Sequence, residues 1–136
     1  MNFLLDTNVL SETRKRNPDQ RVMAWIRSTH TSELHTSVMV IGEIRRGVER
    51  LRHRDTIQAS GYEQWLDQII HTYGERVLPV TGEIAETWGR LNVPDPVPVV
   101  DGLLAATALV HDWTLVTRNV KDVERTGARL LNPFEF

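Results

Sequence analysis

Short runs of apolar residues alternate along the chain with longer segments in which apolar positions recur every three or four residues. Each short run spans a few residues and is bounded by polar or turn-forming residues, as is typical of a buried strand in a parallel sheet. Strands are therefore predicted at residues 2–5, 33–37, around 78–80, 114–117 and 128–133.

The longer segments have the periodicity of helices that bury one face. The clearest follows Ser37, a favourable N-cap residue, and carries apolar side chains at every third or fourth position up to Leu51. Thr7 and Asn8 are expected to cap the first helix, and the alternate prolines of residues 93–99 predict a loop. Helices are predicted at residues 7–14, from 18–19 through 26, and at 38–51, 56–73, 84–91 and 99–111.

Strands that alternate with helices predict an α/β fold with a mainly parallel sheet. The 136 residues are enough for one hydrophobic core, and no repeat, low-complexity tract or linker divides them. Residues 1–136 are therefore expected to form a single domain.

Composition narrows the chemistry. The chain has no cysteine, which excludes disulfides, thiolate metal sites and a cysteine nucleophile. Its net charge of −2 argues against binding nucleic acid through bulk positive charge alone. Because no apolar run approaches ~18 residues, neither a signal peptide nor a membrane span is expected, and the expected location is the cytoplasm.

Acidic and amide residues follow the predicted strands. Asp6 comes directly after the first strand, and Glu43 lies one and a half turns into the helix after the second. Asp101 lies in the first turn of the apolar helix, while Asn119 and Asp122 follow the strand at 114–117. Because open α/β sheets collect their chemistry at the carboxyl ends of the strands, we expect one shared site.

Each residue also has a purely structural interpretation. Asp6 and Asp101 could be helix caps, stabilised by backbone N–H groups and the helix dipole. Glu43 could pair with Arg46 or Arg50 on an exposed helix face. The coincidence of these residues at strand and loop exits favours a common site over unrelated roles.

Clustered carboxylates repel one another unless a cation lies between them. Oxygen ligands without cysteine, and without a histidine pair at metal-binding spacing, favour Mg²⁺ or Mn²⁺ over zinc. The five histidines, at positions 30, 35, 53, 71 and 111, have no such spacing. An acidic metal site of this kind suits hydrolysis of a phosphate ester, and a metal ion would make a buried Asp6 tolerable.

Four ordered motifs carry a family resemblance: LLDTNVLSE, SVMVIGEIRRGV, VDGLLAATAL and LVTRNVKDVERTGARLLNPF. They make the chain resemble the PIN-domain ribonucleases, in particular the VapC-type toxins of the FitB-like branch. The resemblance runs essentially from end to end. It implies a PIN-like three-layer α/β/α fold with a central five-stranded parallel sheet. It also implies Mg²⁺-dependent cleavage of RNA, with Mn²⁺ as a substitute, a homodimer and a cognate antitoxin encoded beside the toxin.

Carried over by motif, Asp6, Glu43 and Asp101 match the three family acids and are the expected metal ligands. At the fourth motif this chain has Asn119 where relatives often have aspartate, and Asp122 matches the acid of the NxxD ending. The resemblance leaves open which of these two completes the catalytic site. Thr117 matches a small hydroxyl residue of the same motif.

Two basic clusters could contact RNA phosphates. They are residues 14–16, and Arg45, Arg46, Arg50, Arg52 and Arg54 along and beyond the Glu43 helix. Each arginine could instead belong to a solvated face with ion pairs between helical neighbours. The leading interpretation is a toxin ribonuclease. A non-catalytic PIN-fold binding module is the alternative, followed by a phosphatase of the haloacid-dehalogenase type, whose second aspartate would be replaced by Asn8.

Overall fold

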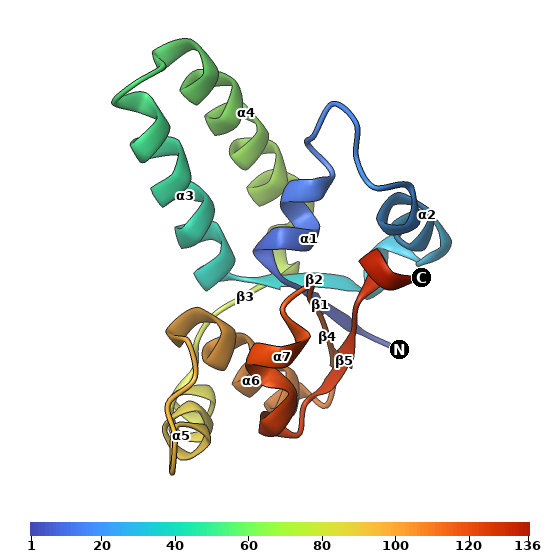
Figure 1. The fold of residues 1–136 in the computed structure, drawn as a ribbon, viewed down its shortest axis with the longest axis vertical. Coiled ribbons are helices and arrows are strands. Elements are labelled where there is room, and N and C mark those ends of the chain that lie inside the picture. Colours follow the sequence, from blue (N-terminus) through green and yellow to red (C-terminus); the bar gives the residue numbers. More distant parts are fainter.

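The computed structural model describes residues 1–136 and contains a five-stranded parallel sheet with helices on both faces (Figure 1). The strands lie in the order β3-β2-β1-β4-β5. They are β1 (Phe3–Leu5), β2 (Leu34–Ser37), β3 (Val77–Leu78), β4 (Thr114–Val116) and β5 (Arg129–Leu131). The helices are α1 (Thr7–Glu12), α2 (Gln20–Ser28), α3 (Val38–Arg52), α4 (Thr56–Tyr73), α5 (Gly82–Leu91), α6 (Val99–His111) and α7 (Val120–Val123).

The helices form two layers around the sheet, which confirms the expected α/β/α architecture. Strands β1, β2 and β3 follow one another toward one edge, while β4 and β5 extend the sheet on the other side of β1. Because parallel crossovers are right-handed, this reversal places α1–α4 on one face and α5–α7 on the other. Figure 1 shows this division and shows α3 and α4 as a helical hairpin that projects from the sheet.

The core is formed by the middle of the sheet and the helix faces turned toward it. Leu4 and Leu5 of β1 are fully buried, as are Ile44 of α3, Leu66 of α4 and Leu104 of α6. The continuous apolar character of β1 and β4 follows from this burial on both sides of the sheet. The core therefore holds β1 rigidly at the point where its carboxyl end delivers Asp6.

Most predicted elements are confirmed, with shifted ends. The strand expected around Pro79 is Val77–Leu78 and ends before the proline, which has no N–H for the ladder. The first helix ends at Glu12 instead of residue 14, and its N-cap is Asp6 instead of Thr7 or Asn8. Ser37 is confirmed as the N-cap of α3, since its hydroxyl accepts a hydrogen bond from the Met39 N–H at 3.0 Å.

Candidate active site

Asp6 lies at the carboxyl end of the central strand and is buried, with 3% of its surface exposed. Its Oδ1 accepts a hydrogen bond from the Thr7 backbone N–H at 2.6 Å. Its Oδ2 accepts one from the Thr117 hydroxyl at 2.7 Å and a longer one from the Asn8 amide at 3.4 Å. Asp6 is therefore both a helix cap and a carboxylate whose second oxygen is held in place by the neighbouring strand exit.

The environment of Asp6 disfavours its charge. Burial raises the pKa of the Asp6 carboxyl, the hydrogen bonds from Thr117 and Thr7 lower it in part, and the charge of Glu43 raises it further. The net pKa shift is upward. Two hydrogen bonds thus do not compensate for the burial of this carboxylate beside another acid.

Glu43 projects from α3 toward the same place. Its Oε1 accepts a hydrogen bond from the Thr7 hydroxyl at 2.5 Å, so the residue after Asp6 connects the two acids. It forms no salt bridge with Arg46 or Arg50, so the interpretation of Glu43 as a surface partner of these arginines is wrong. Thr7 instead fixes one oxygen of Glu43 and leaves Oε2 free.

Asp101 is the third residue of α6 and does not cap it. The N-cap position is occupied by Pro98, and the side chain of Asp101 makes no hydrogen bond. Burial, followed by the charges of Asp6, Asp122 and Glu43, raises the pKa of the Asp101 carboxyl to about 6. The helix-cap interpretation is therefore wrong, and Asp101 is a carboxylate surrounded by others of its kind.

The fourth motif contributes residues in two different ways. Asn119 lines the same cavity as the acids, and its backbone N–H donates to the Thr117 hydroxyl at 3.0 Å. Asp122 lies in α7, is exposed and does not line the cavity, although its charge raises the pKa of Asp101. The backbone N–H of Arg118 donates to Asn8 Oδ1 at 3.2 Å and links this loop to α1.

These residues surround a cavity of about 380 Å³, called the acidic cavity below. No hydrophobic side chain lines it. Its lining residues are Asp6, Thr7, Asn8, Glu43, Arg46, Gly47, Arg50, Asp101 and Asn119. Three carboxylates thus reach one polar cavity: Asp6 and Glu43 follow strands β1 and β2, and Asp101 follows the proline loop that precedes α6.

The donor set fits a hard divalent cation. Asp6, Glu43 and Asp101 offer carboxylate oxygens. The pKa of Asp101 is raised first by burial and then by repulsion from Asp6, Asp122 and Glu43, which a cation would relieve. In the positions that the side chains have here, no group of three His, Cys, Asp or Glu residues converges closely enough to hold an ion. Holding a metal would therefore require the carboxylates to move together, as their attraction to a cation favours.

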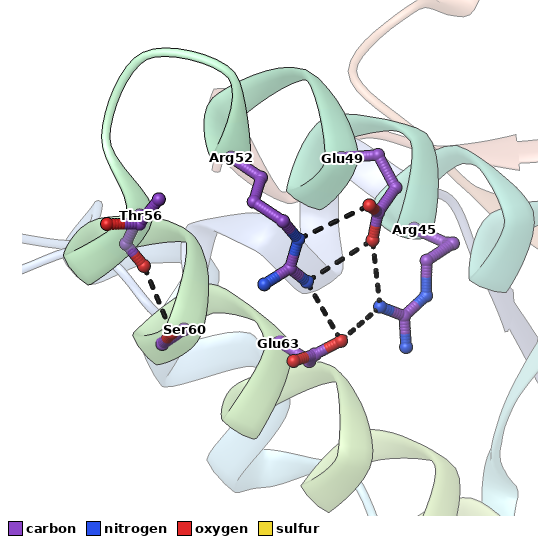
Figure 2. Close-up of polar contacts among 6 residues, drawn as sticks. All are labelled: Arg45, Glu49, Arg52, Thr56, Ser60 and Glu63. Atoms are coloured by element: carbon purple, nitrogen blue, oxygen red, sulfur yellow. Dashed lines mark hydrogen bonds and ion pairs between the residues drawn. The ribbon is translucent and has the colours of Figure 1, made fainter.

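The structure separates the arginines near the site into two groups. Arg45 and Arg52 bridge α3 to α4 through Glu63 and also pair with Glu49 within α3, with N–O distances of 2.5–3.3 Å (Figure 2). Arg46 and Arg50, on the adjacent face of the helix, line the acidic cavity and form no ion pair. The surface-pairing interpretation holds for the first two arginines but not for the second two.

In the other basic cluster, residues 14–16, Arg14 and Lys15 have different partners. Lys15 pairs with Glu12 at 2.9 Å, and the Arg14 guanidinium stacks on the Tyr62 ring at 4.0 Å from its centroid. Glu12 is a buried acid that the sequence did not single out. Its carboxylate is paired with Lys15 and accepts a hydrogen bond from the Asp19 backbone N–H at 2.8 Å. Both contacts lower the pKa of the Glu12 carboxyl, so Glu12 plays a structural role.

Thr7 is the site residue that sequence reasoning missed, because it was assigned only to helix capping. Its position directly after Asp6 placed it at the strand exit, but nothing in the local pattern indicates a partner 36 residues away.

Comparison with known protein families assigns the chain to one family. The PIN domain model matches residues 3–128, and the chain belongs to this family. Membership of this family argues against the phosphatase interpretation of LLDTN. The contacts of Asn8 agree, because its amide donates to Asp6 and accepts from the Arg118 backbone N–H. None of the helices is both long and apolar enough to cross a bilayer.

Within the family, the chain is similar to VapC-type toxins over nearly its whole length. The VapC ribonuclease Y4jK of Sinorhizobium fredii is 30% identical, with 98% of each chain covered. Toxin FitB of Neisseria gonorrhoeae is 28% identical, with 97% of this chain and 98% of that one covered. The crystal structure of FitAcB from Neisseria gonorrhoeae superposes with a TM-score of 0.90 at 28% identity, covering 98% of this chain and 99% of the other.

Proposed function

We propose that the chain is a Mg²⁺-dependent endoribonuclease and the toxin of a type II toxin–antitoxin pair. The observation that carries this proposal is the acidic cavity, which Asp6, Glu43 and Asp101 line together with two unpaired arginines. Carboxylates attract the cation, and arginines attract the phosphates of the substrate. Its relatives named VapC ribonuclease and Toxin FitB support the choice of RNA and the toxin role.

Asp6, Asp101 and Glu43 would hold Mg²⁺, for which Mn²⁺ can substitute. When bound, the ion would neutralise a phosphate oxygen and lower the pKa of an attacking water. Thr117 and Thr7 would keep one oxygen each of Asp6 and Glu43 in place, because their hydroxyls donate to these carboxylates.

The remaining polar groups have complementary roles. The free Oε2 of Glu43 is available to accept the proton of the attacking water. Asn119 can orient water or offer its carbonyl oxygen as a ligand to the metal ion, but an amide cannot act as a base. Asp122 would act on the site through its charge on Asp101, from outside the cavity.

Arg46 and Arg50 would contact the phosphates of the RNA strand. They are one turn apart on α3, they line the acidic cavity, and no acid occupies their guanidinium groups. Arg45 and Arg52 are engaged with Glu49 and Glu63 and would contribute little to binding. Arg46→Gln and Arg45→Gln therefore form a matched pair, in which the first should weaken RNA binding more than the second.

A cognate antitoxin and a second copy of the chain are the proposed protein partners. Similar solved structures include FitAB bound to a DNA fragment, at 27% identity and a TM-score of 0.87, which supports an antitoxin. Co-expression with the protein encoded by the adjacent reading frame should yield a stable complex. Light scattering should give twice the mass of one chain for the isolated protein.

The direct test compares RNA with DNA of the same sequence. Purified protein should cleave a labelled single-stranded RNA in Mg²⁺ or Mn²⁺, should not cleave it in EDTA, and should leave the DNA intact. Failure to cleave RNA with either ion would contradict the enzymatic proposal. Binding of RNA without cleavage would instead identify a non-catalytic PIN-fold module.

A further inference from the structure

A second cavity, of about 190 Å³, adjoins the acidic cavity at the start of α3. Glu43 and Arg46 line both cavities, so the two share a wall. The residues that line the second cavity are Val38, Met39, Gly42, Glu43, Arg46 and Val100. Any ligand that occupies the acidic cavity therefore has this second hollow directly beside it.

The chemistry of the second cavity differs from that of the first. Val38, Met39 and Val100 give it apolar walls, whereas no hydrophobic side chain lines the acidic cavity. Val38 is 42% exposed, so its side chain is accessible to a ligand in this cavity. The carboxylate of Glu43 and the guanidinium of Arg46 add one acceptor and one donor group at the shared wall.

We propose that this second cavity, the base pocket, binds the nucleobase next to the scissile phosphate. The inference rests on the proposed ribonuclease function and deepens it by naming a base-binding subsite. Apolar walls with a few polar groups suit a flat aromatic ring whose edge carries donors and acceptors.

The position of Arg46 favours RNA over other occupants. An apolar protein side chain would gain nothing from a guanidinium and a carboxylate at its side, whereas a nucleotide joins an anionic phosphate to a ring with polar edges. With its phosphate in the acidic cavity, the base of the same or the next nucleotide lies within reach of the base pocket. Arg46, between the two cavities, can contact either group.

Gly42 allows the base pocket to be filled without disturbing the fold. It lines the pocket, and a Cβ added there would meet no atom within 4 Å. Gly42→Leu places a strong helix former in the interior of α3 and adds a bulky side chain at the lining of the pocket. Gly61→Leu is the matched control, because Gly61 also lies inside a helix with open space at its Cβ, but on α4 and away from both cavities.

The experiment first maps the cleavage site of the wild-type protein in a mixed-sequence RNA of ~20 nucleotides. The same RNA is then made with an abasic nucleotide on either side of the scissile bond. On the intact RNA, Gly42→Leu should lower kcat/KM by about tenfold, the order expected when one base loses its apolar contacts, while Gly61→Leu should not. On the RNA that lacks the bound base, Gly42→Leu and wild type should be equal, because both lack the base contact.

Several results would overturn the inference. They are equal rates for Gly42→Leu and wild type on intact RNA, or an equal loss on intact and both abasic RNAs. A change of oligomeric mass in Gly42→Leu, measured by light scattering, would assign the cavity to a contact between copies of the chain. Gly42→Ala, which fills less of the pocket, should show a smaller effect in the same direction if a folding defect obscures the leucine variant. Failure of the wild type to cleave any RNA is a different result, because it removes the proposed function itself.

Discussion

Replacement of Asp101 by asparagine should stabilise the metal-free protein at neutral pH. Burial and the charges of Asp6, Asp122 and Glu43 raise the pKa of Asp101 from 3.8 to about 6, so its charged form is disfavoured in the folded state. A raised folded-state pKa means that the contribution to stability is fully present below pH ~4 and is lost as the pH rises through ~6. Asp101→Asn removes the charge and with it this loss.

The magnitude follows from the pKa shift. The rise of the Asp101 pKa from 3.8 to about 6 corresponds to roughly 3 kcal/mol at most. Because Asp101 is partly exposed, solvent screening reduces the expected gain to about 1–2 kcal/mol. Urea unfolding in EDTA should therefore show Asp101→Asn more stable than wild type by this amount at pH 7.5, with the difference vanishing near pH 4.

Asp67→Asn on the exposed surface of α4 is the control for loss of a charge anywhere in the chain. It should change the free energy of unfolding by less than ~0.5 kcal/mol at both pH values. If Asp101→Asn proves equally stable or less stable than wild type at pH 7.5, burial and the neighbouring acids do not disfavour the Asp101 charge, and the reasoning about the site is refuted.

Three further predictions concern the neighbours of Asp101. Glu43→Gln should lose cleavage activity with a smaller loss of Mn²⁺ affinity than Asp6→Asn. A calorimetric titration that shows the reverse order would make Glu43, and not Asp6, the more important direct ligand of the metal ion. Asn119→Asp should tighten Mn²⁺ binding because affinity for a hard cation follows ligand charge, whereas Asp122→Asn should weaken it less than Asp6→Asn does. Loss of binding in Asp122→Asn with no effect of Asn119→Asp would make Asp122 the fourth ligand. Gly102→Ala should destabilise the fold by roughly 1–3 kcal/mol in urea, because a Cβ there lies 3.0–3.2 Å from Val97 and Trp88; unchanged stability would mean that these side chains move aside freely.

The sequence predicts the fold well because its signals are local. The apolar run of β1 and the regular spacing after Ser37 each reflect burial of a continuous segment, and both elements form where expected. The end of β3 was missed by two residues because the apolar pattern continues through Pro79, while the hydrogen-bond ladder cannot. The short α7 was not predicted, since its four residues carry no helical periodicity.

The site was only partly predictable, because its chemistry depends on contacts between distant segments. The positions of Asp6 and Glu43 after strands, and of Asp101 after the proline loop, predicted a common edge, since parallel strands carry their exits to one side. The bond between Thr7 and Glu43 depends on how α1 and α3 cross the sheet, which no local pattern encodes. The pairing of the arginines is local only in part, because Glu49 is their neighbour on α3 whereas Glu63 comes from α4.

The rate of RNA cleavage under single-turnover conditions in Mg²⁺ tests the central claim most directly, with wild type, Asp101→Asn and Asp67→Asn measured side by side. We expect Asp101→Asn to lose on the order of 100-fold or more in rate, because a ligand of the catalytic cation is removed, and Asp67→Asn to match wild type. Cleavage by Asp101→Asn at the wild-type rate would show that the acidic cavity is not where this chain does its chemistry.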